Sequence, residues 1–205
     1  MNTKELGVII AFTALAAALN LVKIPTIYLL YFSYQLGDII LVIAFLLLGL
    51  KKGFVVAVLN MIVSIAINPS IVTLIGGPYY LVSVLTMVLG VYLFEKLIRP
   101  KIKNKQTGMG KSTTISTILS ILTRTIIMLP LDYYVFGFLV SLASGWSISV
   151  AYASVLAIMP LIIFYNITVP LYVVAISYLI TDKLLKHFNS ALFADSFISS
   201  RSKVA

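Results

Sequence analysis

The sequence predicts an all-α membrane protein with six transmembrane helices and with both termini on the cytoplasmic side. Of its 205 residues, 61% are hydrophobic and only 10% are charged, whereas soluble domains have about 25% charged residues. The apolar residues lie in long blocks, as a bilayer core of about 30 Å requires. The blocks lack the alternation of polar and apolar residues that a membrane barrel needs, so helices must satisfy the backbone hydrogen bonds.

The whole chain, 1–205, is expected to form a single integral membrane domain. Its six predicted helices are residues 5–23, 36–51, 53–68, 78–98, 112–142 and 151–186. The first follows a weakly basic start and leads into more membrane, which favours a retained helix over a cleaved signal peptide. The last two exceed one bilayer crossing, so tilt or kinks are expected there. Pro130, Pro160 and Pro170 lie inside them and can supply kinks.

The connections between these helices differ in composition. Residues 99–111 are polar and basic, which is typical of a solvated cytoplasmic loop. A nucleotide or anion site at Gly108-Met109-Gly110-Lys111-Ser112 is the alternative, although the phosphate-loop spacing is incomplete. Residues 24–36 are apolar and aromatic without a charge, so we expect a lid folded over the outer helix ends. Residues 68–78 have turn residues at both ends and predict a second lid or a re-entrant turn.

Basic residues determine the predicted orientation, because cytoplasmic loops are enriched in Lys and Arg. With the N-terminus inside, the cytoplasmic segments hold 13 of the 15 basic residues. These are Lys4, Lys51, Lys52, Lys96, Arg99, Lys101, Lys103, Lys105, Lys111, Lys183, Lys186, Arg201 and Lys203. The net charge of +9 is thus explained by topology rather than by nucleic-acid binding. We expect a multi-pass protein of the plasma membrane, in which Lys23 and Arg124 are left unexplained.

Three polar residues in the last two predicted helices are candidate substrate-binding residues. Arg124 lies roughly 18 Å from the cytoplasmic end of its helix, near the bilayer centre. A charge there costs a few kcal/mol unless it is paired or lines a cavity; a structural arginine that bonds backbone carbonyls is the alternative. Asp132 lies about 80° around the same helix, as a ligand contact or an outer cap. Asn166 lies beside a carbonyl that Pro170 cannot bond, which suits a cavity wall.

Tyrosines gather on the predicted outer side. Eight of the 12 lie there, namely Tyr28, Tyr31, Tyr34, Tyr79, Tyr80, Tyr133, Tyr134 and Tyr152. An aromatic belt at the interface is one explanation. A pocket open to the outside, which would bind flat ligands by stacking, is the other. Within this pocket the candidate ligand contacts are Tyr31, Tyr34, Tyr79, Tyr80, Tyr133 and Tyr165.

Catalytic chemistry has no support in the sequence. The chain has no cysteine, and its one histidine, His187, has no second ligand or nucleophile near it in the sequence. We therefore expect neither an enzyme nor a metal site, and no cofactor other than a transported ligand. A self-sufficient secondary transporter remains a separate class, although no internal repeat is evident.

The first predicted helix contains Ala14-Leu-Ala-Ala-Ala18, and Ala14 and Ala18 have the spacing that lets another helix approach closely. Packing within the chain is the alternative. Further motifs are Leu36-Gly-Asp38, Leu122-Thr-Arg-Thr-Ile-Ile-Met128 followed by Asp132-Tyr-Tyr, and Phe164-Tyr-Asn-Ile. Together these motifs resemble the S-components of energy-coupling factor vitamin transporters, most of all the riboflavin-specific type.

This resemblance implies a six-helix subunit that captures a water-soluble vitamin from outside, here riboflavin. Its partners would be a transmembrane coupling subunit, met through Ala14 and Ala18, and two ATPase subunits. The segment after Asn166 has no lysine, where the riboflavin type more usually carries one nearby. Another vitamin or precursor such as pantothenate therefore remains the alternative ligand.

Overall fold

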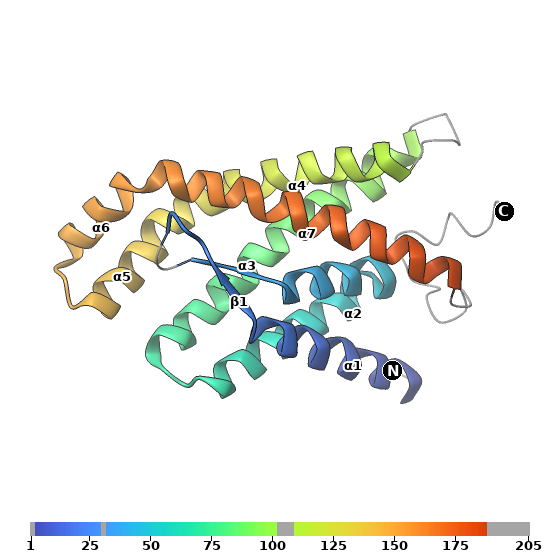
Figure 1. The fold of residues 1–205 in the computed structure, drawn as a ribbon, viewed down its shortest axis with the longest axis horizontal. Helices are drawn as coiled ribbons and strands as arrows, with labels where there is room; N and C mark the ends of the chain where they lie inside the picture. The colour runs from blue at the N-terminus through green and yellow to red at the C-terminus, as the bar shows by residue number, and fades with distance from the viewer. Residues whose placement is uncertain (1–2, 30–31, 102–108, 188–205) are drawn as a thin grey trace.

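The computed structural model describes residues 3–29, 32–101 and 109–187, which form helical rods packed side by side along one long axis (Figure 1). In chain order the elements are α1 (Thr3–Asn20), β1 (Lys23–Pro25), β2 (Ser33–Gln35), α2 (Gly37–Ile67), α3 (Ile71–Leu93), the π-helix η1 (Phe94–Ile98), the 3₁₀ turn η2 (Arg99–Lys101), α4 (Met109–Leu131), the π-helix η3 (Asp132–Phe136), α5 (Gly137–Ser144), α6 (Ile148–Ala157) and α7 (Met159–His187).

Five helical segments of the described chain are long and apolar enough to cross a membrane. They are Thr3–Asn20, Gly37–Ile67, Ile71–Ile98, Gly110–Ser144 and Met159–Lys186. These segments indicate a membrane-embedded protein, and the predicted all-α class is confirmed to that extent. The small two-stranded sheet was not predicted.

The predicted helices 36–51 and 53–68 are joined as α2, which is broken at Gly49. The backbone of Gly49 has φ 79° and ψ 176°, a conformation that glycine adopts without a steric penalty. A Cβ on Gly53 would lie 2.8 Å from the Cα of Phe45, although residues eight apart in a straight helix are separated by about 12 Å. The chain therefore folds back at Gly49, and the two halves of α2 pack against each other (Figure 1).

Residues 68–78 belong mostly to a helix. Ser70 caps α3: its Oγ accepts a hydrogen bond from the Thr73 N–H, and the Thr73 Oγ1 accepts one from the Ser70 N–H. This reciprocal pair satisfies backbone donors that a helix start leaves free. The expected second lid or re-entrant turn is therefore wrong, because the serine that resembles a turn residue is the cap of a helix beginning at Ile71.

The two long C-terminal windows behave differently. Residues 112–142 fall in one helical stretch, in which Pro130 lies shortly before the π-helical turn η3. Residues 151–186 are divided at Ile158 into α6 and α7, with Pro160 in the first turn of α7. The expected kinks thus correspond to a break near Pro160, whereas Pro170 lies inside α7.

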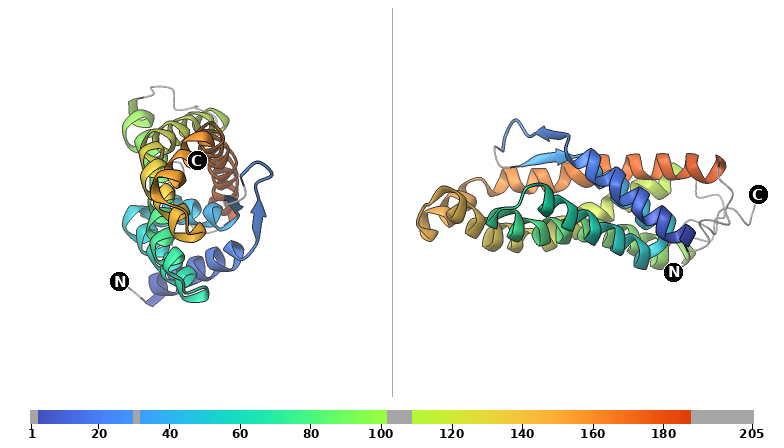
Figure 2. Two further views of the ribbon diagram at one scale, coloured as in Figure 1. Left: turned by 90° about the vertical axis from the view of Figure 1, so that its left-hand side faces the viewer. Right: turned by 90° about the horizontal axis from the view of Figure 1, so that it is seen from below.

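The aromatic segment between α1 and α2 folds back onto the bundle as expected, but it lies along the side of α7 rather than over the helix ends (Figure 2). Its strands β1 and β2 pair antiparallel, with Lys23 opposite Gln35. The Tyr165 hydroxyl of α7 donates to the Ser33 carbonyl at 2.8 Å, and the Tyr172 hydroxyl donates to the Gln35 carbonyl at 3.2 Å. Figure 2 shows this hairpin on the outside of the bundle, next to α7.

The two ends of the bundle differ in composition. The start of α1, the Gly49 turn, η2, the start of α4 and the end of α7 gather at one end, which we call the basic end (Figure 1). Together with η1, these segments carry Lys4, Lys51, Lys52, Lys96, Arg99, Lys101, Lys111, Lys183 and Lys186. Lys103, Lys105, Arg201 and Lys203 lie outside the described residues. The hairpin, the start of α3 and the α5–α6 turn form the opposite end, which we call the aromatic end.

Candidate ligand-binding site

A cavity of about 280 Å³ lies among the hairpin, α3, α4, α5 and α7 toward the aromatic end. Its volume is near the lower end of the range for small-molecule sites, about 300–1,000 Å³. Its polar lining comes from Ser33, Gln35, Asp38, Tyr79, Tyr80, Ser83, Arg124, Tyr165 and Asn166. Its apolar lining comes from Phe32, Val72, Gly76, Met128, Phe136, Leu139, Val140 and Ala143.

Arg124 is the central cation of this cavity, and its side chain is almost fully buried at 3% exposure. Its Nε donates to the Asn166 Oδ1 at 3.1 Å, and its Nη1 donates to the Ser83 carbonyl at 3.4 Å. Its Cζ lies 5.8 Å from the centre of the Tyr165 ring, within cation–π range. A guanidinium carries five N–H donors, so these bonds among the described residues leave donors for a ligand.

Asn166 connects Arg124 to the carboxyl group of Asp132. Its Nδ2 donates to the Asp132 Oδ2 at 2.6 Å, while its Oδ1 accepts from Arg124. The Tyr79 hydroxyl donates to the other oxygen of Asp132. A donor on one side and an acceptor on the other determine the amide orientation. These hydrogen bonds connect Arg124, Asn166, Asp132 and Tyr79, which we call the site network, and they join α4, α7, η3 and α3.

Asp38 is a second buried acid at the cavity, at the start of α2. The Tyr80 hydroxyl donates to its Oδ1, and the Asn20 amide lies 3.5 Å from the same hydroxyl. Asp38 belongs to one of the sequence motifs but was not predicted as a site residue. An acid in the first turn of a helix is usually explained by the helix dipole. The position of Asp38 therefore did not distinguish it from an ordinary helix-end residue.

Aromatic rings close one side of the cavity. The Phe32 ring of the hairpin lies 4.8 Å from the rings of both Phe136 and Tyr165. Met128 lines the cavity as well and is fully buried. Phe32, Phe136 and Met128 were not predicted as site residues, because an apolar side chain in an apolar segment carries no local sign of what it faces.

The structure brings most of the predicted site residues together. Arg124, Asn166, Tyr79, Tyr80 and Tyr165 all line the cavity. Asp132 is bonded to Tyr79 and Asn166 and is only 1% exposed. It therefore supports the lining residues from behind rather than capping the helix in solvent.

The remaining predicted tyrosines lie elsewhere. The Tyr34 hydroxyl is 2.5 Å from that of Tyr28 and 2.9 Å from the Thr168 Oγ1, so Tyr34 attaches the hairpin to α7 outside the cavity lining. Tyr133 stacks on Tyr152 with ring centres 5.3 Å apart and is not among the cavity-lining residues. Tyr31 lies outside the described residues.

The alanine motif of α1 has two faces. Ala16 and Ala17 are buried within the chain, whereas Ala14 and Ala18 are exposed. Gly7 and Ala11 are exposed as well, so the small side chains form a stripe on the outer surface of α1. Packing within the chain therefore does not account for the spacing of Ala14 and Ala18.

Comparisons with known proteins add no family assignment, since neither the protein-family models nor the curated proteins contain a match to this chain. Within the described residues, no group of three or more His, Cys, Asp or Glu side chains could hold a metal ion. The geometry of the cavity and the sequence motifs are therefore the basis of the proposed function.

Proposed function

We propose that the chain is the substrate-binding S-component of an energy-coupling factor importer and that its cavity binds riboflavin. The observation that carries this proposal is a buried arginine in a cavity beneath the hairpin, beside aromatic rings, whose hydrogen bonds to described residues use only part of its five donors. An S-component has no catalytic activity of its own. A transmembrane coupling subunit and two ATPase subunits would supply the energy for uptake.

The chemistry of the lining suits a flat, uncharged ligand. The isoalloxazine ring of riboflavin has an apolar face and one edge on which carbonyl acceptors flank an N–H donor. Arg124 offers donors for the carbonyls, and Asp38 offers an acceptor for the N–H. Phe32 and Tyr165 offer aromatic surface. Pantothenate fits less well, because its carboxylate would meet two buried acids, Asp38 and Asp132, with one guanidinium to offset them.

The proposal includes six membrane crossings with both termini in the cytoplasm. The fold-back at Gly49 supports two crossings from α2 rather than one. The collection of lysines and arginines at the basic end supports a cytoplasmic location for that end. The hairpin and the cavity would then face the exterior, from which a vitamin is captured.

Ligand binding is the decisive test. The purified protein in lipid nanodiscs should quench riboflavin fluorescence saturably at micromolar concentration or below, and excess pantothenate should not restore the fluorescence. Replacement of Asn166 by Leu should abolish the quenching, because it removes the bridge between Arg124 and Asp132. Absence of saturable quenching by the wild-type protein at micromolar riboflavin would refute the riboflavin assignment.

The exposed stripe on α1 supports the proposed contact with a coupling subunit, because small residues let two membrane helices approach closely. Combined replacement of Ala14 and Ala18 by Leu should abolish riboflavin uptake in cells that express the coupling and ATPase subunits, while binding is retained. Ala153→Leu, on the exposed face of α6, is the matched control and should preserve uptake. Normal uptake by the double variant would exclude this stripe as the partner surface.

A self-sufficient secondary transporter is the alternative class of function. It predicts riboflavin uptake in a host that lacks the coupling and ATPase subunits. The S-component proposal predicts binding without uptake in that host, so one uptake assay separates the two classes.

A further inference from the structure

A second cavity of about 290 Å³ lies beside the first, among α1, β1, the second half of α2 and the start of α3. Gln35, Val72, Gly76 and Tyr80 line both cavities. The two spaces are therefore separated by a common wall, built from the first turns of α3 and from the end of β2.

Gly76 is the residue of this wall at which a side chain is absent and space is free. A Cβ placed on Gly76 would meet no atom within 4 Å. A Cβ on the next residue, Gly77, would lie 2.8 Å from the Ile65 side chain, so the neighbouring position is filled by packing between α3 and α2. Free space beside a residue that lines both cavities leaves room for a flexible chain to pass between them.

The two cavities offer different chemistry. The first has Phe32, Phe136 and Tyr165 in its walls, whereas the shared Tyr80 is the one aromatic residue that lines the second. The polar lining specific to the second cavity comes from Asn20, Lys23, Ser64, Asn68 and Thr73. A lining of amides and hydroxyls suits a polar, hydrogen-bonding chain rather than a flat ring.

Lys23 is the one charged residue among those that line the second cavity. It pairs with Gln35 across the hairpin, which places it next to the shared wall. Lys23 and Arg124 are the two basic residues that membrane topology leaves unexplained, and each lines one of two adjoining cavities. A single ammonium group in the lining of a polar cavity is suited to an anionic group such as a phosphate ester.

We propose that the second cavity is a subsite for the polar tail of the ligand, with Lys23 as the contact for a terminal phosphate. This inference rests on the proposed function, because it assumes that a flavin ring occupies the first cavity. It adds that the polyhydroxyl chain passes Gly76 and that a phosphorylated flavin is also a ligand.

Binding of three flavins distinguishes the two subsites. Lumiflavin has the ring without the tail, riboflavin adds the tail, and flavin mononucleotide adds the terminal phosphate. Ser64 lines the second cavity and Ala143 the first, so Ser64→Leu and Ala143→Leu form a matched pair. Ser64→Leu should lower the affinity for riboflavin and flavin mononucleotide about tenfold and change the affinity for lumiflavin less than about twofold. Ala143→Leu should lower the affinity for all three flavins about equally. Equal weakening of lumiflavin and riboflavin by Ser64→Leu would overturn the tail subsite.

The charge is tested by Lys23→Gln, an exposed position at which the fold should tolerate the change. Flavin mononucleotide should lose roughly fivefold in affinity while riboflavin is unchanged. Equal affinities of the variant and the wild type for flavin mononucleotide would overturn the phosphate contact. If wild-type protein binds lumiflavin as tightly as riboflavin and flavin mononucleotide, the subsite is refuted and the proposed function stands. Failure of all three flavins to bind would refute both.

Discussion

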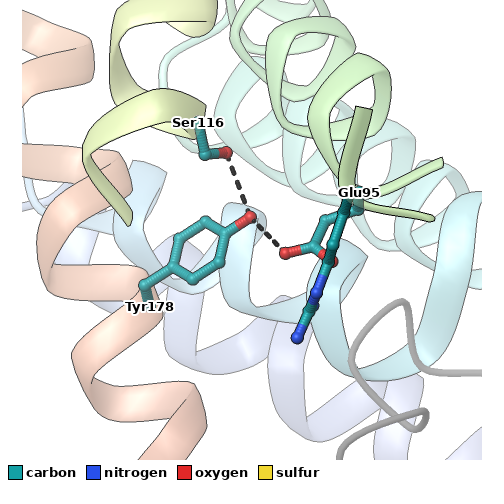
Figure 3. A network of polar contacts seen from close by, with 4 residues as sticks. Glu95, Ser116 and Tyr178 are labelled. Atoms are coloured by element: carbon teal, nitrogen blue, oxygen red, sulfur yellow. Dashed lines mark hydrogen bonds and ion pairs between the residues drawn. The ribbon is translucent and has the colours of Figure 1, made fainter. Parts of the chain in front are cut away.

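Two buried polar networks lie in opposite halves of the molecule, and they differ in what surrounds them. The site network of Arg124, Asn166, Asp132 and Tyr79 adjoins a cavity. In the second network, the Tyr178 hydroxyl donates to the Glu95 Oε1 at 2.8 Å and lies 3.0 Å from the Ser116 Oγ (Figure 3). Arg99 pairs with the other oxygen of Glu95. We call this second group the Glu95 network.

The Glu95 network is enclosed by tight packing. Ser112, Ser116 and Ser120 lie at four-residue intervals on one face of α4, and all three are fully buried. A Cβ on Gly90 of α3 would collide with the Ser120 backbone, so the two helices are in close contact there. None of the four residues of the Glu95 network lines either cavity described above.

The comparison shows that buried charge alone does not define a binding site. Both networks join α3 or its extension η1 to α4 and α7. The site network leaves Arg124 donors beside a cavity. In the Glu95 network the polar groups bond to one another in a packed region. We infer that the Glu95 network holds the helices together at the basic end, while the site network is available to a ligand.

The largest expected effect is on stability, from Glu95→Ala. The change leaves Arg99 without its acid and the buried Tyr178 hydroxyl without its acceptor, which should cost about 3 kcal/mol. A lower midpoint of thermal unfolding in detergent, with riboflavin affinity unchanged in the folded fraction, is the expected result.

The matched control is Glu5→Ala, which removes the acid of the more exposed Lys52–Glu5 pair at the same end. Pairs of this kind contribute about 0–1 kcal/mol, so the midpoint should barely move. Equal decreases in the unfolding midpoint of the two variants would mean that the Glu95 network contributes no more to stability than the Lys52–Glu5 pair. A loss of affinity from Glu95→Ala in folded protein would mean that the binding site extends to the basic end.

A smaller effect, on affinity, is expected from the same substitution made in the two networks. Arg124→Lys replaces a planar group that bonds Asn166 and the Ser83 carbonyl by a single ammonium group that cannot reproduce both contacts. Riboflavin affinity should fall by about 2 kcal/mol, or roughly 30-fold. Arg99→Lys is the matched control and should leave the affinity unchanged, as measured by fluorescence titration. Comparable losses in both variants would contradict the division between site and support.

Arg124 and Asn166 could be identified from the sequence because a polar group in an apolar helix is itself a signal. A guanidinium near the bilayer centre must be paired or line a cavity, and the structure shows both for Arg124. Asp38 and Glu95 were missed because each lies near a helix end, where an acid has an ordinary explanation. Their burial depends on Tyr80 and Tyr178, which reach them from other parts of the chain.

The fold followed the same pattern. Long apolar blocks predicted the helices. The connections between them were harder to predict, because the same residue types occur in turns and at helix ends. Ser70 resembles a loop residue until Thr73 completes the cap. Lys23–Pro25 and Ser33–Gln35 pair as strands, and the hydrogen bonds to Ser33 and Gln35 come from Tyr165 and Tyr172, more than a hundred positions away. Local sequence cannot specify contacts at that separation.

The smallest expected effect concerns the attachment of the hairpin. Tyr34→Phe keeps the ring contacts with Tyr165 and Tyr172 but removes the hydroxyl that bonds Tyr28 and Thr168. Such bonds contribute about 1 kcal/mol, so riboflavin should dissociate roughly fivefold faster in stopped-flow measurements. The matched control is Tyr133→Phe, outside the cavity lining, which should dissociate at the wild-type rate. If both variants keep the wild-type rate, the hairpin does not control ligand release, and the cavity must open between helices instead.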